Sequence, residues 1–481
     1  MLRIARVIKD FASCFRTAGF QCYLVGGAVR DMLLGRRVSD FDIATDALPQ
    51  EVQRRFHRVI PTGIKHGTVT VLFRGNRFEV TTFRIDQEYR DGRRPDGVVF
   101  TPSIEEDLKR RDFTINAIAY DLAEERVLDP HAGRRDLKAG IIRAIGDPLE
   151  RFLEDGLRPL RACRFAAQFD FHIEERTFAS IPAALDTVRK VSAERIRDEL
   201  QRLLEAPKPS VGFRLMRDCG LLEVLIPELA ACTGVEQREL HCFDVFEHLL
   251  ATCDAAPRQS LPVRLAALLH DIGKPPALER EAGGGLRFHG HESLSAEITE
   301  RIMRRLRFSN SEVIRTAHLV RHHMFNYDES WSDAAVRRFL ARVGPEHVAD
   351  LLALRRADQV GRCNDDSPSA NLVALQKHIE RILAADQALG LADLAVDGRE
   401  LMKALELAPG PVVGILLDAL LETVLDDPEQ NDRSTLLEIA RRLSAERIKT
   451  GLEPGPASRP ASRRRPASRH RRGSSPGAGG P

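Results

Sequence analysis

The sequence predicts an α+β protein with a small mixed or antiparallel β-sheet near its N-terminus and an all-helical remainder. Short runs rich in Val, Thr and Phe recur before residue 84, as in β-strands. From Asp147 to about Ile448, apolar residues recur at the spacing of amphipathic helices. From Gly451 the chain is rich in Pro, Arg, Ser and Gly and has too few apolar residues to bury a core. We therefore expect this last segment to be disordered.

The expected N-terminal elements follow from local patterns. Ile4, Val7, Ile8, Phe11 and Phe15 recur at helical spacing with charges between them, which predicts a surface helix rather than a signal peptide. Strands are predicted where Val, Thr and Phe cluster, with one helix between the second and third strand: strands 22–25, 41–45, 67–73 and 77–83, and helix 49–59. Residues 84–97 are polar and lack periodicity, which predicts a loop.

Composition is typical of a soluble protein. The 481 residues predict about three domains. Hydrophobic residues make up 43% and charged residues 30%, and no window approaches the roughly 18 apolar residues of a transmembrane helix. The eight cysteines include no CxxC pair, which favours buried thiols in a reducing compartment over disulfides or a zinc–thiolate site. We expect a cytoplasmic protein with no membrane partner.

The basic charge is confined to the end of the chain. The segment from Gly451 contributes +6 to a net charge of +2, which leaves −4 for the first 450 residues. An unstructured basic segment of this kind predicts non-specific affinity for RNA.

Two adjacent glycines mark a candidate phosphate site. Gly26 and Gly27 follow a predicted strand and precede a predicted helix that contains Arg30. Because they have no side chains, backbone N–H groups can approach a phosphate at the start of the helix. Glycine pairs are also common in simple turns, so this pair needs support from other residues.

Three acidic residues provide that support. Asp40 and Asp42 are two residues apart on a predicted strand, so they point to the same face while Phe41 enters the core. The carboxylates repel each other unless a cation lies between them; alternatively, they belong to a solvated strand end. Glu79 on a neighbouring strand adds a third carboxylate of the kind that binds Mg²⁺ together with substrate phosphates. Two metal ions would activate an attacking hydroxyl and stabilise leaving pyrophosphate, which favours nucleotidyl transfer.

The motifs of the first 170 residues resemble those of one enzyme family. In order, they are LVGGAVRD, DFDIAT, GIKHGTVTV, EVTTFR, RRDFTINAIAYD and RFLEDGLRPLRACRF. Together they resemble the class II tRNA nucleotidyltransferases (CCA-adding enzymes) and the related bacterial poly(A) polymerases, in the DNA polymerase β superfamily. The resemblance implies that Asp40 and Asp42 bind catalytic metal ions and that Glu79 is the third acidic residue. It further implies triphosphate binding by Gly26, Gly27 and Arg30, ribose recognition around Arg111, Asp112 and Asn116, and nucleotide binding by Asp155, Arg158, Arg161 and Arg164.

Base selection is predicted from Glu154-Asp155-x-x-Arg158. Cytosine and adenine share an amino donor beside a ring-nitrogen acceptor, whereas uracil and guanine present a carbonyl and an N–H there. Asp155 accepting from the amine and Arg158 donating to the ring nitrogen would select C and A. Alternatively, the two residues form only a helical ion pair. The usual proline after Glu-Asp in the family is Gly156 here, and Pro159 is tolerated only near the first helical turn.

Histidines and acids further along the chain form a second constellation. The segments HCFDVFEH, LLHDIGKP, FHGHES, LVRHHM and RRADQVGR resemble HD-type metal phosphohydrolase domains. The resemblance implies a divalent transition metal bound by His248, His270, Asp271, His291, His323 and Asp358, with His289 and His322 as near-register alternatives. It implies phosphodiesterase or phosphatase activity on 2′,3′-cyclic or 3′-phosphate RNA ends; alternatively, the domain keeps its fold without a metal.

The combined prediction divides the chain into a catalytic nucleotidyltransferase head (1–146), a helical neck with the base-selecting motif (147–215), an HD-like helical body (216–365), a helical tRNA-binding tail (366–450) and the basic extension (451–481). The predicted function is template-independent addition of C, C and A to the 3′ end of tRNA from CTP and ATP, with Mg²⁺ in the head and no DNA partner. Residues 88–95 resemble the flexible loop involved in complete CCA addition. Poly(A) or A-only addition uses the same motifs and stays open, as does an HD phosphohydrolase whose head only binds tRNA.

Overall fold

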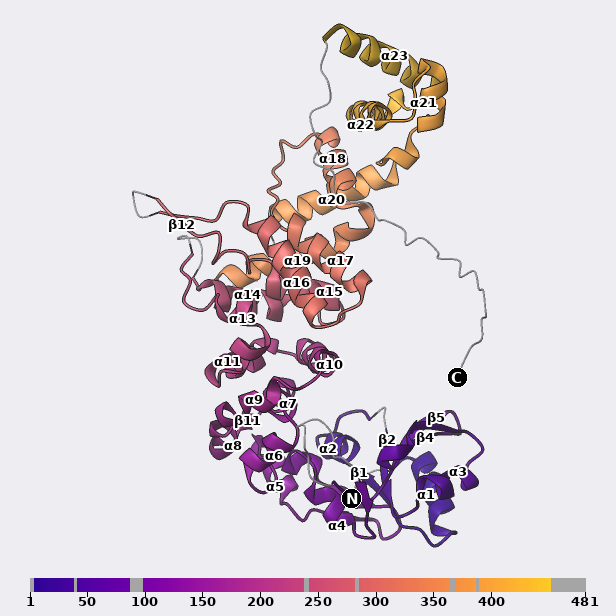
Figure 1. Cartoon of the computed structure of the whole chain (residues 1–481), viewed down its shortest axis with the longest axis vertical. Coiled ribbons are helices and arrows are strands. Elements are labelled where there is room, and N and C mark those ends of the chain that lie inside the picture. Colours follow the sequence, from indigo (N-terminus) through magenta and orange to yellow (C-terminus); the bar gives the residue numbers. More distant parts are fainter. Residues whose placement is uncertain are drawn as a thin grey trace, which may run out of the picture. The chain divides into compact units, whose positions relative to one another are not determined.

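The structure is a computed structural model that describes residues 4–38, 41–86, 98–237, 242–281, 285–363, 369–385 and 389–450. Asp40, the loop expected at residues 88–95 and the basic extension from Gly451 lie outside these residues. Within the described residues, the predicted α+β class is confirmed. Figure 1 shows strands gathered in the indigo N-terminal part of the chain and mostly helices in the magenta, orange and yellow parts.

A mixed sheet of seven strands forms the centre of the head, in the order β3-β4-β5-β2-β1-β8-β9. Strands β2 and β5 pair in parallel, and the other neighbours in this sheet pair antiparallel. The strands are β1 (Cys22–Val25), β2 (Phe41–Thr45), β3 (Val59–Gly63), β4 (Thr68–Phe73), β5 (Asn76–Thr82), β8 (Ala119–Asp121) and β9 (Arg126–Leu128). The four strands expected from the sequence are present to within one residue at each end.

Two regions differ from the expected pattern. The helix expected over residues 49–59 ends at Arg55, and Val59 begins β3 because it pairs with Val71 of β4. The expected loop begins instead with β6 (Arg84–Asp86), which pairs antiparallel with β7 (Val98–Phe100). The sequence analysis does not predict β3, β6, β8 and β9, which are recognised by the hydrogen bonds that their main chains make with neighbouring strands. Strands of three to five residues are too short to show alternation in the sequence.

One face of the sheet is covered by α1 (Arg6–Arg16) and α3 (Pro49–Arg55). Phe41 and Ile43 of β2 and Phe78 of β5 are buried there against Phe11 of α1. The Phe11 and Phe78 rings stack with their centroids 4.0 Å apart. Since successive strand residues point to opposite faces, Asp42 projects from the other face of the sheet.

Helices dominate the chain after the head. The helices that cover or follow the sheet are α2 (Gly27–Leu33), α4 (Ile104–Lys109), α5 (Gly133–Ala139), α6 (Pro148–Glu154), α7 (Arg158–Phe169), α8 (Glu175–Ala179), α9 (Leu185–Val188), α10 (Ala193–Leu204) and α11 (Pro209–Asp218). Those further along are α12 (Leu221–Leu225), α13 (Pro227–Ala230), α14 (Val245–Ala255), α15 (Leu261–Leu269), α16 (His291–Arg305), α17 (Asn310–His322), α18 (Asp333–Val343), α19 (Pro345–Cys363) and α20 (Ala370–Ala384). The short pieces are β10 (Ile141–Ile142), β11 (His172–Ile173), β12 (Glu279–Arg280), β13 (Leu286–Arg287), and the 3₁₀ turns η1 (Ile64–His66), η2 (Thr114–Asn116), η3 (Pro182–Ala184), η4 (Leu391–Asp393) and η5 (Pro428–Gln430).

The chain forms two compact units, residues 1–331 with 342–380, and residues 332–341 with 381–481. The second unit contains α21 (Gly398–Leu405), α22 (Pro411–Asp426) and α23 (Arg433–Thr450). It has its own core, in which Leu401, Leu420 and Leu436 are buried together. Arg337 of α18 closes the end of α22 by donating to the carbonyl oxygen of Leu425 at 2.7 Å.

The cysteines differ in one respect from the sequence analysis, which expects free thiols and no disulfide. Among the described residues, Cys14, Cys22, Cys163, Cys219, Cys232 and Cys253 are free. Cys242 is disulfide-bonded, so the expectation is wrong at this residue. A disulfide joins residues that folding brings together, and spacing along the chain does not reveal them.

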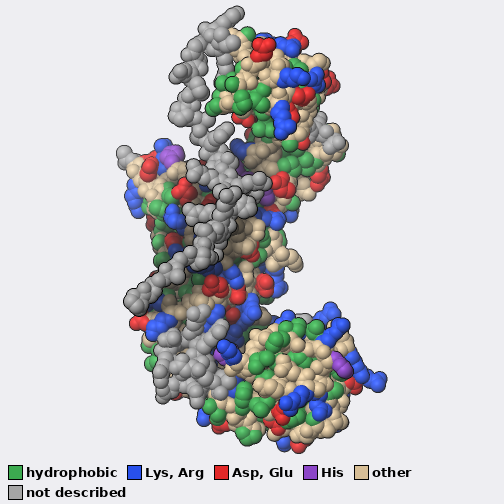
Figure 2. All heavy atoms as spheres, turned by 45° about the vertical axis from the view of Figure 1, so that its right-hand side comes forward, with side chains coloured by type: hydrophobic (Ala, Val, Ile, Leu, Met, Phe, Trp, Pro, Cys, Tyr) green, Lys and Arg blue, Asp and Glu red, His purple; other side chains and the backbone are tan. Residues whose placement is uncertain are grey.

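The described surface mixes both signs of charge. On the face shown in Figure 2, Lys and Arg side chains are interspersed with Asp and Glu, and hydrophobic side chains lie between them. Within the part of the chain that the structure describes, no helix is long and apolar enough to cross a membrane.

Candidate functional site

A cavity of about 700 Å³ opens on the face of the sheet that carries Asp42. All head and neck residues predicted to bind nucleotide or metal line it, apart from Asp40, which lies outside the described residues. These lining residues are Gly26, Gly27, Arg30, Asp42, Glu79, Arg111, Asp112, Asn116, Asp155, Arg158, Arg161 and Arg164. Further lining residues, which the sequence analysis does not single out, include Arg37, Arg110, Phe165, Gln168 and Arg202.

Asp42 and Glu79 lie side by side on neighbouring strands. They are direct partners in the parallel register of β2 and β5, so their side chains leave the sheet on the same face. Glu79 is half exposed, and its Oε1 accepts a hydrogen bond from Arg77 Nη2 at 3.0 Å. Carboxylate oxygens beside a cavity rich in arginine fit a hard cation that also binds phosphate oxygens, such as Mg²⁺.

Gly26 allows two functional side chains to approach the main chain closely. Its φ of +65° lies in the left-handed region, which glycine adopts without strain. A Cβ at this position would lie 2.7 Å from Arg111 Nη1 and 3.8 Å from Asp42 Oδ2. Any other residue would therefore displace the Arg111 guanidinium from this wall of the cavity.

A chain of hydrogen bonds joins the head to α7. Arg30 Nη1 donates to Asn116 Oδ1 at 2.6 Å, and Asn116 Nδ2 donates to Asp112 Oδ1 at 3.0 Å. Asp112 Oδ2 accepts from Arg161 Nε at 2.8 Å and from Arg161 Nη2 at 2.7 Å. Burial opposes ionisation of Asp112, yet the Arg161 charge and the hydrogen bonds from Asn116 and Arg161 hold its pKa well below its usual value. The carboxylate is therefore charged at neutral pH.

Arg164 lies on the next turn of α7. Its guanidinium pairs with the carboxylate of Glu199 from α10 and lies 3.8 Å from the centroid of the Phe165 ring. Burial lowers the pKa of Arg164 to about 10, so the side chain remains protonated at neutral pH. Glu199 is absent from the sequence-based site. The sequence feature that could have identified Glu199 is its position on the apolar face of α10, where an acid stands beside the buried Ile196 and Leu200.

Asp155 and Arg158 both line the cavity but have other partners. Asp155 Oδ2 accepts from Arg195 Nη2 at 2.7 Å. Arg158 Nη1 donates to Glu154 Oε2 at 2.6 Å, and its Nη2 donates to the carbonyl oxygen of Arg110 at 3.1 Å. Asp155 and Arg158 therefore each pair with another residue. They do not form the ion pair with each other that is the alternative interpretation of this motif. Arg195, like Glu199, comes from α10 and was not predicted.

The junction between α6 and α7 accounts for Gly156 and Pro159. Because α7 begins at Arg158, Pro159 lies in the first turn, where its missing N–H would have no helical partner. A Cβ at residue 156 would lie 2.4 Å from the carbonyl oxygen of Thr187. Glycine is therefore needed for the junction to pack against Thr187, and the departure from the family's usual proline has a steric cause.

The body contains a second cluster of buried polar side chains. Its members are His248 on α14, His270 and Asp271 after α15, His291 at the start of α16, His323 after α17 and Asp358 on α19. Distant segments thus bring all six predicted ligands together.

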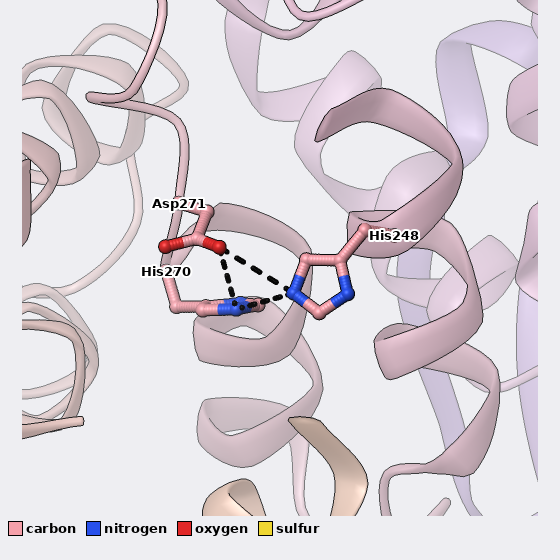
Figure 3. Close-up of side chains that lie close together, drawn as sticks. All are labelled: His248, His270 and Asp271. Carbon is pink, nitrogen blue, oxygen red and sulfur yellow. Dashed lines mark hydrogen bonds and ion pairs between the residues drawn. The ribbon is translucent and has the colours of Figure 1, made fainter. Parts of the chain in front are cut away.

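Asp271 lies between two groups of histidines. Its Oδ2 is 3.4 Å from Nε2 of both His248 and His270, and Figure 3 shows the three side chains pointing toward one another. Its Oδ1 is 3.1 Å from His291 Nε2 and 3.5 Å from His323 Nε2. Two histidine nitrogens therefore lie on each side of one carboxylate, and each pair forms a group of three potential ligand atoms with an oxygen of Asp271. This arrangement fits two neighbouring divalent cations that share Asp271.

Main-chain carbonyls fix the tautomers of these histidines. Nδ1 of His248, His270, His291 and His323 lies 3.1, 3.0, 2.8 and 2.7 Å, respectively, from a carbonyl oxygen. Because a carbonyl only accepts, each neutral ring carries its proton on Nδ1 and presents a lone pair at Nε2. The Nε2 atoms of His248 and His270 are 3.1 Å apart, and those of His291 and His323 have no hydrogen-bond partner. Lone pairs that converge in a buried site fit imidazole-bound divalent metals.

Nearby charges act on this cluster in both directions: the carboxylates of Asp271 and Asp358 favour a cation, whereas Arg355 and Lys274 already bind these carboxylates as cations. Burial opposes the charged form of His270, but Asp271 and Asp358 raise its pKa to about 9. Arg355 Nη1 binds Asp358 Oδ2 at 2.7 Å, which leaves Oδ1 within 3.6 Å of His270 Nε2. Lys274 Nζ lies 2.6 Å from Asp271 Oδ2. The sequence analysis does not identify Arg355 or Lys274, because nothing in their spacing links them to the acids they contact in three dimensions.

The structure leaves both near-register histidines out of the cluster's ligand groups, although His289 lines the cavity beside the cluster. His289 is exposed, and the His322 ring lies against His318 with the centroids 4.5 Å apart. Neither belongs to the ligand groups found among the described residues. A cavity of about 420 Å³ opens beside the cluster and is lined by Lys274, Phe288 and Arg362 among others, so a substrate could reach it.

Known families match the chain in three consecutive regions. The poly A polymerase head domain matches residues 22–143. The probable RNA and SrmB-binding site of polymerase A matches residues 170–233, and the HD domain matches residues 238–381.

The curated relatives are CCA-adding enzymes. The enzyme of Lactiplantibacillus plantarum is 32% identical over 449 residues, which cover 91% of this chain and 96% of that protein. The enzyme of Latilactobacillus sakei is 35% identical over 429 residues, 88% of this chain and 94% of that protein. The enzyme of Lactobacillus helveticus is 49% identical over 213 residues, 44% of this chain and 53% of that protein. The chain spans about half the length of this and several other curated relatives that it matches.

Solved structures show the same fold. The Bacillus stearothermophilus CCA-adding enzyme in complex with CTP is 28% identical, with a TM-score of 0.72 over 92% of this chain and 98% of that chain. The Thermotoga maritima CCA-adding enzyme complexed with tRNA_CCA is 20% identical, with a TM-score of 0.51 over 92% of this chain and 97% of that chain. The head and its matches define a nucleotidyltransferase. The chain belongs to the family of CCA-adding enzymes.

Replacing Gly156 with alanine should destabilise the junction between α6 and α7. Because the added Cβ would meet the Thr187 backbone, we expect Gly156→Ala to lower the free energy of unfolding by about 1–3 kcal/mol. Gly63→Ala is the matched control, since a Cβ there meets only ordinary contacts at 3.6 Å. Urea denaturation followed by circular dichroism measures both. Equal midpoints for the two variants would contradict the steric account.

Proposed function

We propose that the protein adds C, C and A in turn to the 3′ end of tRNA, using CTP and ATP and releasing pyrophosphate. One observation carries the proposal: a single cavity is lined both by the acids of the sheet and by the Asp155 and Arg158 motif of the neck. Chemistry and base recognition would then share one space, with protein side chains in the role of a template. The similar Bacillus stearothermophilus enzyme, solved with CTP, supports a nucleotide in this cavity.

Mg²⁺ is the cation that the donors of the head favour. Asp40 and Asp42 would hold it, with Glu79 next to Asp42 in the strand register. When bound, two such ions would supply charge stabilisation to the attacking and leaving oxygens. Arg30 and Arg111, at the glycine turn, would bind the triphosphate through charge-assisted hydrogen bonds. Asp112 and Asn116, held by Arg161, would form the ribose side of the site.

Asp155 and Arg158 would read the edge that cytosine and adenine share. Arg195 and Glu154 act as positioning residues, because they hold Asp155 and Arg158 in the observed geometry. Uracil and guanine would place an acceptor against Asp155 and a donor against Arg158. Each buried polar group left unpaired costs about 1–3 kcal/mol, which is enough for strong rejection when both are mismatched.

We also propose a second activity, metal-dependent phosphohydrolysis in the HD domain. The observation in favour is the convergence of four histidine lone pairs around Asp271 and Asp358. His248, His270 and the two carboxylates would hold one divalent transition metal, and His291 and His323 would hold another with Asp271. When bound, the metal would activate water toward a phosphoester. Phosphorylated or 2′,3′-cyclic RNA ends are the proposed substrates, because removing the phosphate yields the hydroxyl that nucleotide addition needs.

The main activity can be tested on tRNA that ends at the discriminator base. Purified protein should add CC from CTP alone and CCA from CTP with ATP, as read by sequencing the product ends. An A-only or poly(A) enzyme would fail to add C. Asp42→Asn should slow addition at least about a hundredfold, because the amide loses its attraction for the cation. Asp46→Asn, outside the cavity lining, should add normally. Normal addition by Asp42→Asn would contradict the metal assignment.

Base selection can be tested by replacing the acceptor. Asp155→Ala should lower the preference for CTP over UTP, measured as the ratio of kcat/KM values, by about tenfold or more. Arg195→Ala should lower it in the same direction but less, because Asp155 remains and only its orientation is lost. Asp186→Ala removes an exposed Asp–Arg pair and serves as the control. If Asp155→Ala discriminates as well as the unmodified protein, the protein-template assignment is wrong.

Metal binding in the body can be tested independently of nucleotide addition. Protein stripped with a chelator should bind Co²⁺ or Ni²⁺, and His291→Ala should weaken binding at least about tenfold. His57→Ala is the control, because this histidine is exposed, lies in the head and is outside both ligand groups. Hydrolysis of a 2′,3′-cyclic phosphate RNA end should follow metal occupancy, and CCA addition should not. Equal metal affinity in both variants would rule out this ligand set.

A further inference from the structure

Two phenylalanine rings stack on α7 beside the nucleotide cavity, and we call them the aromatic pair. Phe165 and Phe169 are one helical turn apart, and their ring centroids lie 5.7 Å apart with 11° between the ring planes. Both side chains are buried, and Phe165 lines the cavity. Phe113 of the head meets Phe165 edge-on, with the centroids 5.8 Å apart. Buried rings packed in this way offer a rigid surface to the side chains around them.

Guanidinium groups from two helices lie against these rings. The guanidinium carbon of Arg30, in α2, is 4.6 Å from the Phe169 centroid and 5.3 Å from the Phe165 centroid. On α7, the guanidinium carbons of Arg161 and Arg164 are 5.3 and 3.8 Å from the Phe165 centroid. All four distances lie within the roughly 6 Å over which the face of an aromatic ring attracts a cation. The aromatic pair is therefore a contact that arginines of α2 and α7 share.

Phe165 links Arg30 directly to Arg164. Each arginine has its own acid, because Asp31 binds Arg30 Nε at 2.9 Å and Glu199 pairs with Arg164. Two guanidinium groups carry like charges and repel each other, and separate acids on separate elements do not fix the distance between them. A ring that attracts both groups keeps them close and adds no negative charge.

Arg30 is held at the place where a phosphate of the nucleotide is expected. A Cβ at Gly27 would lie 3.5 Å from Arg30 Nη2, so this nitrogen lies against the glycine turn. A triphosphate binds most tightly to guanidinium groups whose spacing is set before it arrives, because less side-chain entropy is then lost. We propose that the aromatic pair positions Arg30 and Arg164 for the triphosphate of the incoming nucleotide. This inference rests on the proposed nucleotide addition.

The experiment compares the full-length protein with Phe169→Leu, which removes a ring face and keeps an apolar side chain. KM for CTP and KM for ATP should both rise about fivefold, because the triphosphate is common to the two substrates. The preference for CTP over UTP should stay within about twofold, because Asp155 and Arg158 are unchanged. Phe169→Tyr keeps the ring face and should restore both KM values to within about twofold of the unmodified protein.

Phe171→Leu is the matched control. The Phe171 ring also packs against Phe169, with the centroids 5.6 Å apart, whereas the guanidinium groups beside α7 lie over Phe165 and Phe169. The control should therefore leave KM for both nucleotides within about twofold of the unmodified protein.

Inorganic pyrophosphate gives a second readout that does not depend on catalysis. Its Kd in the presence of Mg²⁺ can be measured by calorimetry with the same variants. Phe169→Leu should raise this Kd by about the same factor as KM for the nucleotides, because pyrophosphate has the phosphates and lacks the base. Phe171→Leu should leave it unchanged.

The possible outcomes separate this proposal from the proposed function. If the unmodified protein does not extend tRNA, the function fails, and the pyrophosphate titration alone then decides the role of the aromatic pair. Equal Kd values for pyrophosphate in Phe169→Leu and the unmodified protein would overturn the proposal. A lower kcat with unchanged KM would also overturn it, because the ring would then serve packing alone. Should Phe169→Leu unfold, Phe169→Met refills the space without a ring face, and the same rise in KM and Kd is expected.

Discussion

The buried hydrogen-bond chain from Arg30 through Asn116 and Asp112 to Arg161 is the constraint on which the nucleotide site depends. It runs from α2 to the first turn of α7, so it couples the head, which carries the acids, to the helix that follows the motif proposed to read the base. Removing one partner of a buried ion pair leaves an uncompensated charge and typically costs about 3–5 kcal/mol. The hydrogen bonds therefore tie residues of the head to a residue of the neck along the wall of the cavity.

Strand alternation and the family resemblance named residues that line the cavity, but they did not predict which side chains contact one another there. Alternation along β2 predicted that Phe41 is buried and that Asp42 faces away from the core, and the structure agrees. The pattern could not predict that β2 pairs in parallel with β5, because that partner is chosen by the packing of the whole sheet. The same holds for Arg195 and Glu199, since α10 meets α7 only after folding. For this pair of helices, the one sequence feature that points to an interhelical contact is an acid, Glu199, on the apolar face of α10.

The two sites differ in the groups that supply positive charge: arginine side chains in the head and neck, and, as proposed, cations bound by histidines in the body. Around the nucleotide cavity the cations are arginines, which stay protonated even where burial lowers the pKa, as for Arg164. Around Asp271 the neighbouring side chains are histidines whose Nδ1 atoms face main-chain carbonyl oxygens. The resemblance to HD domains indicated this cluster. It did not indicate that one carboxylate is shared by two groups, because that arrangement depends on α14, α15, α16 and α17 meeting. The first site suits anionic substrates directly, and the second suits them only through bound cations.

The parallel pairing of β2 with β5 also limits how this head can change in evolution. Side chains alternate between faces along a strand, so inserting or deleting one residue in β5 before Glu79 would turn its carboxylate into the aromatic core and bring Phe78 to the surface. The hairpin between β4 and β5 turns at Arg74 and Gly75, both with positive φ, and offers no slack to absorb such a shift. Changes of length in this hairpin are consequently viable only in pairs of residues, whereas substitutions on its exposed face remain free to accumulate.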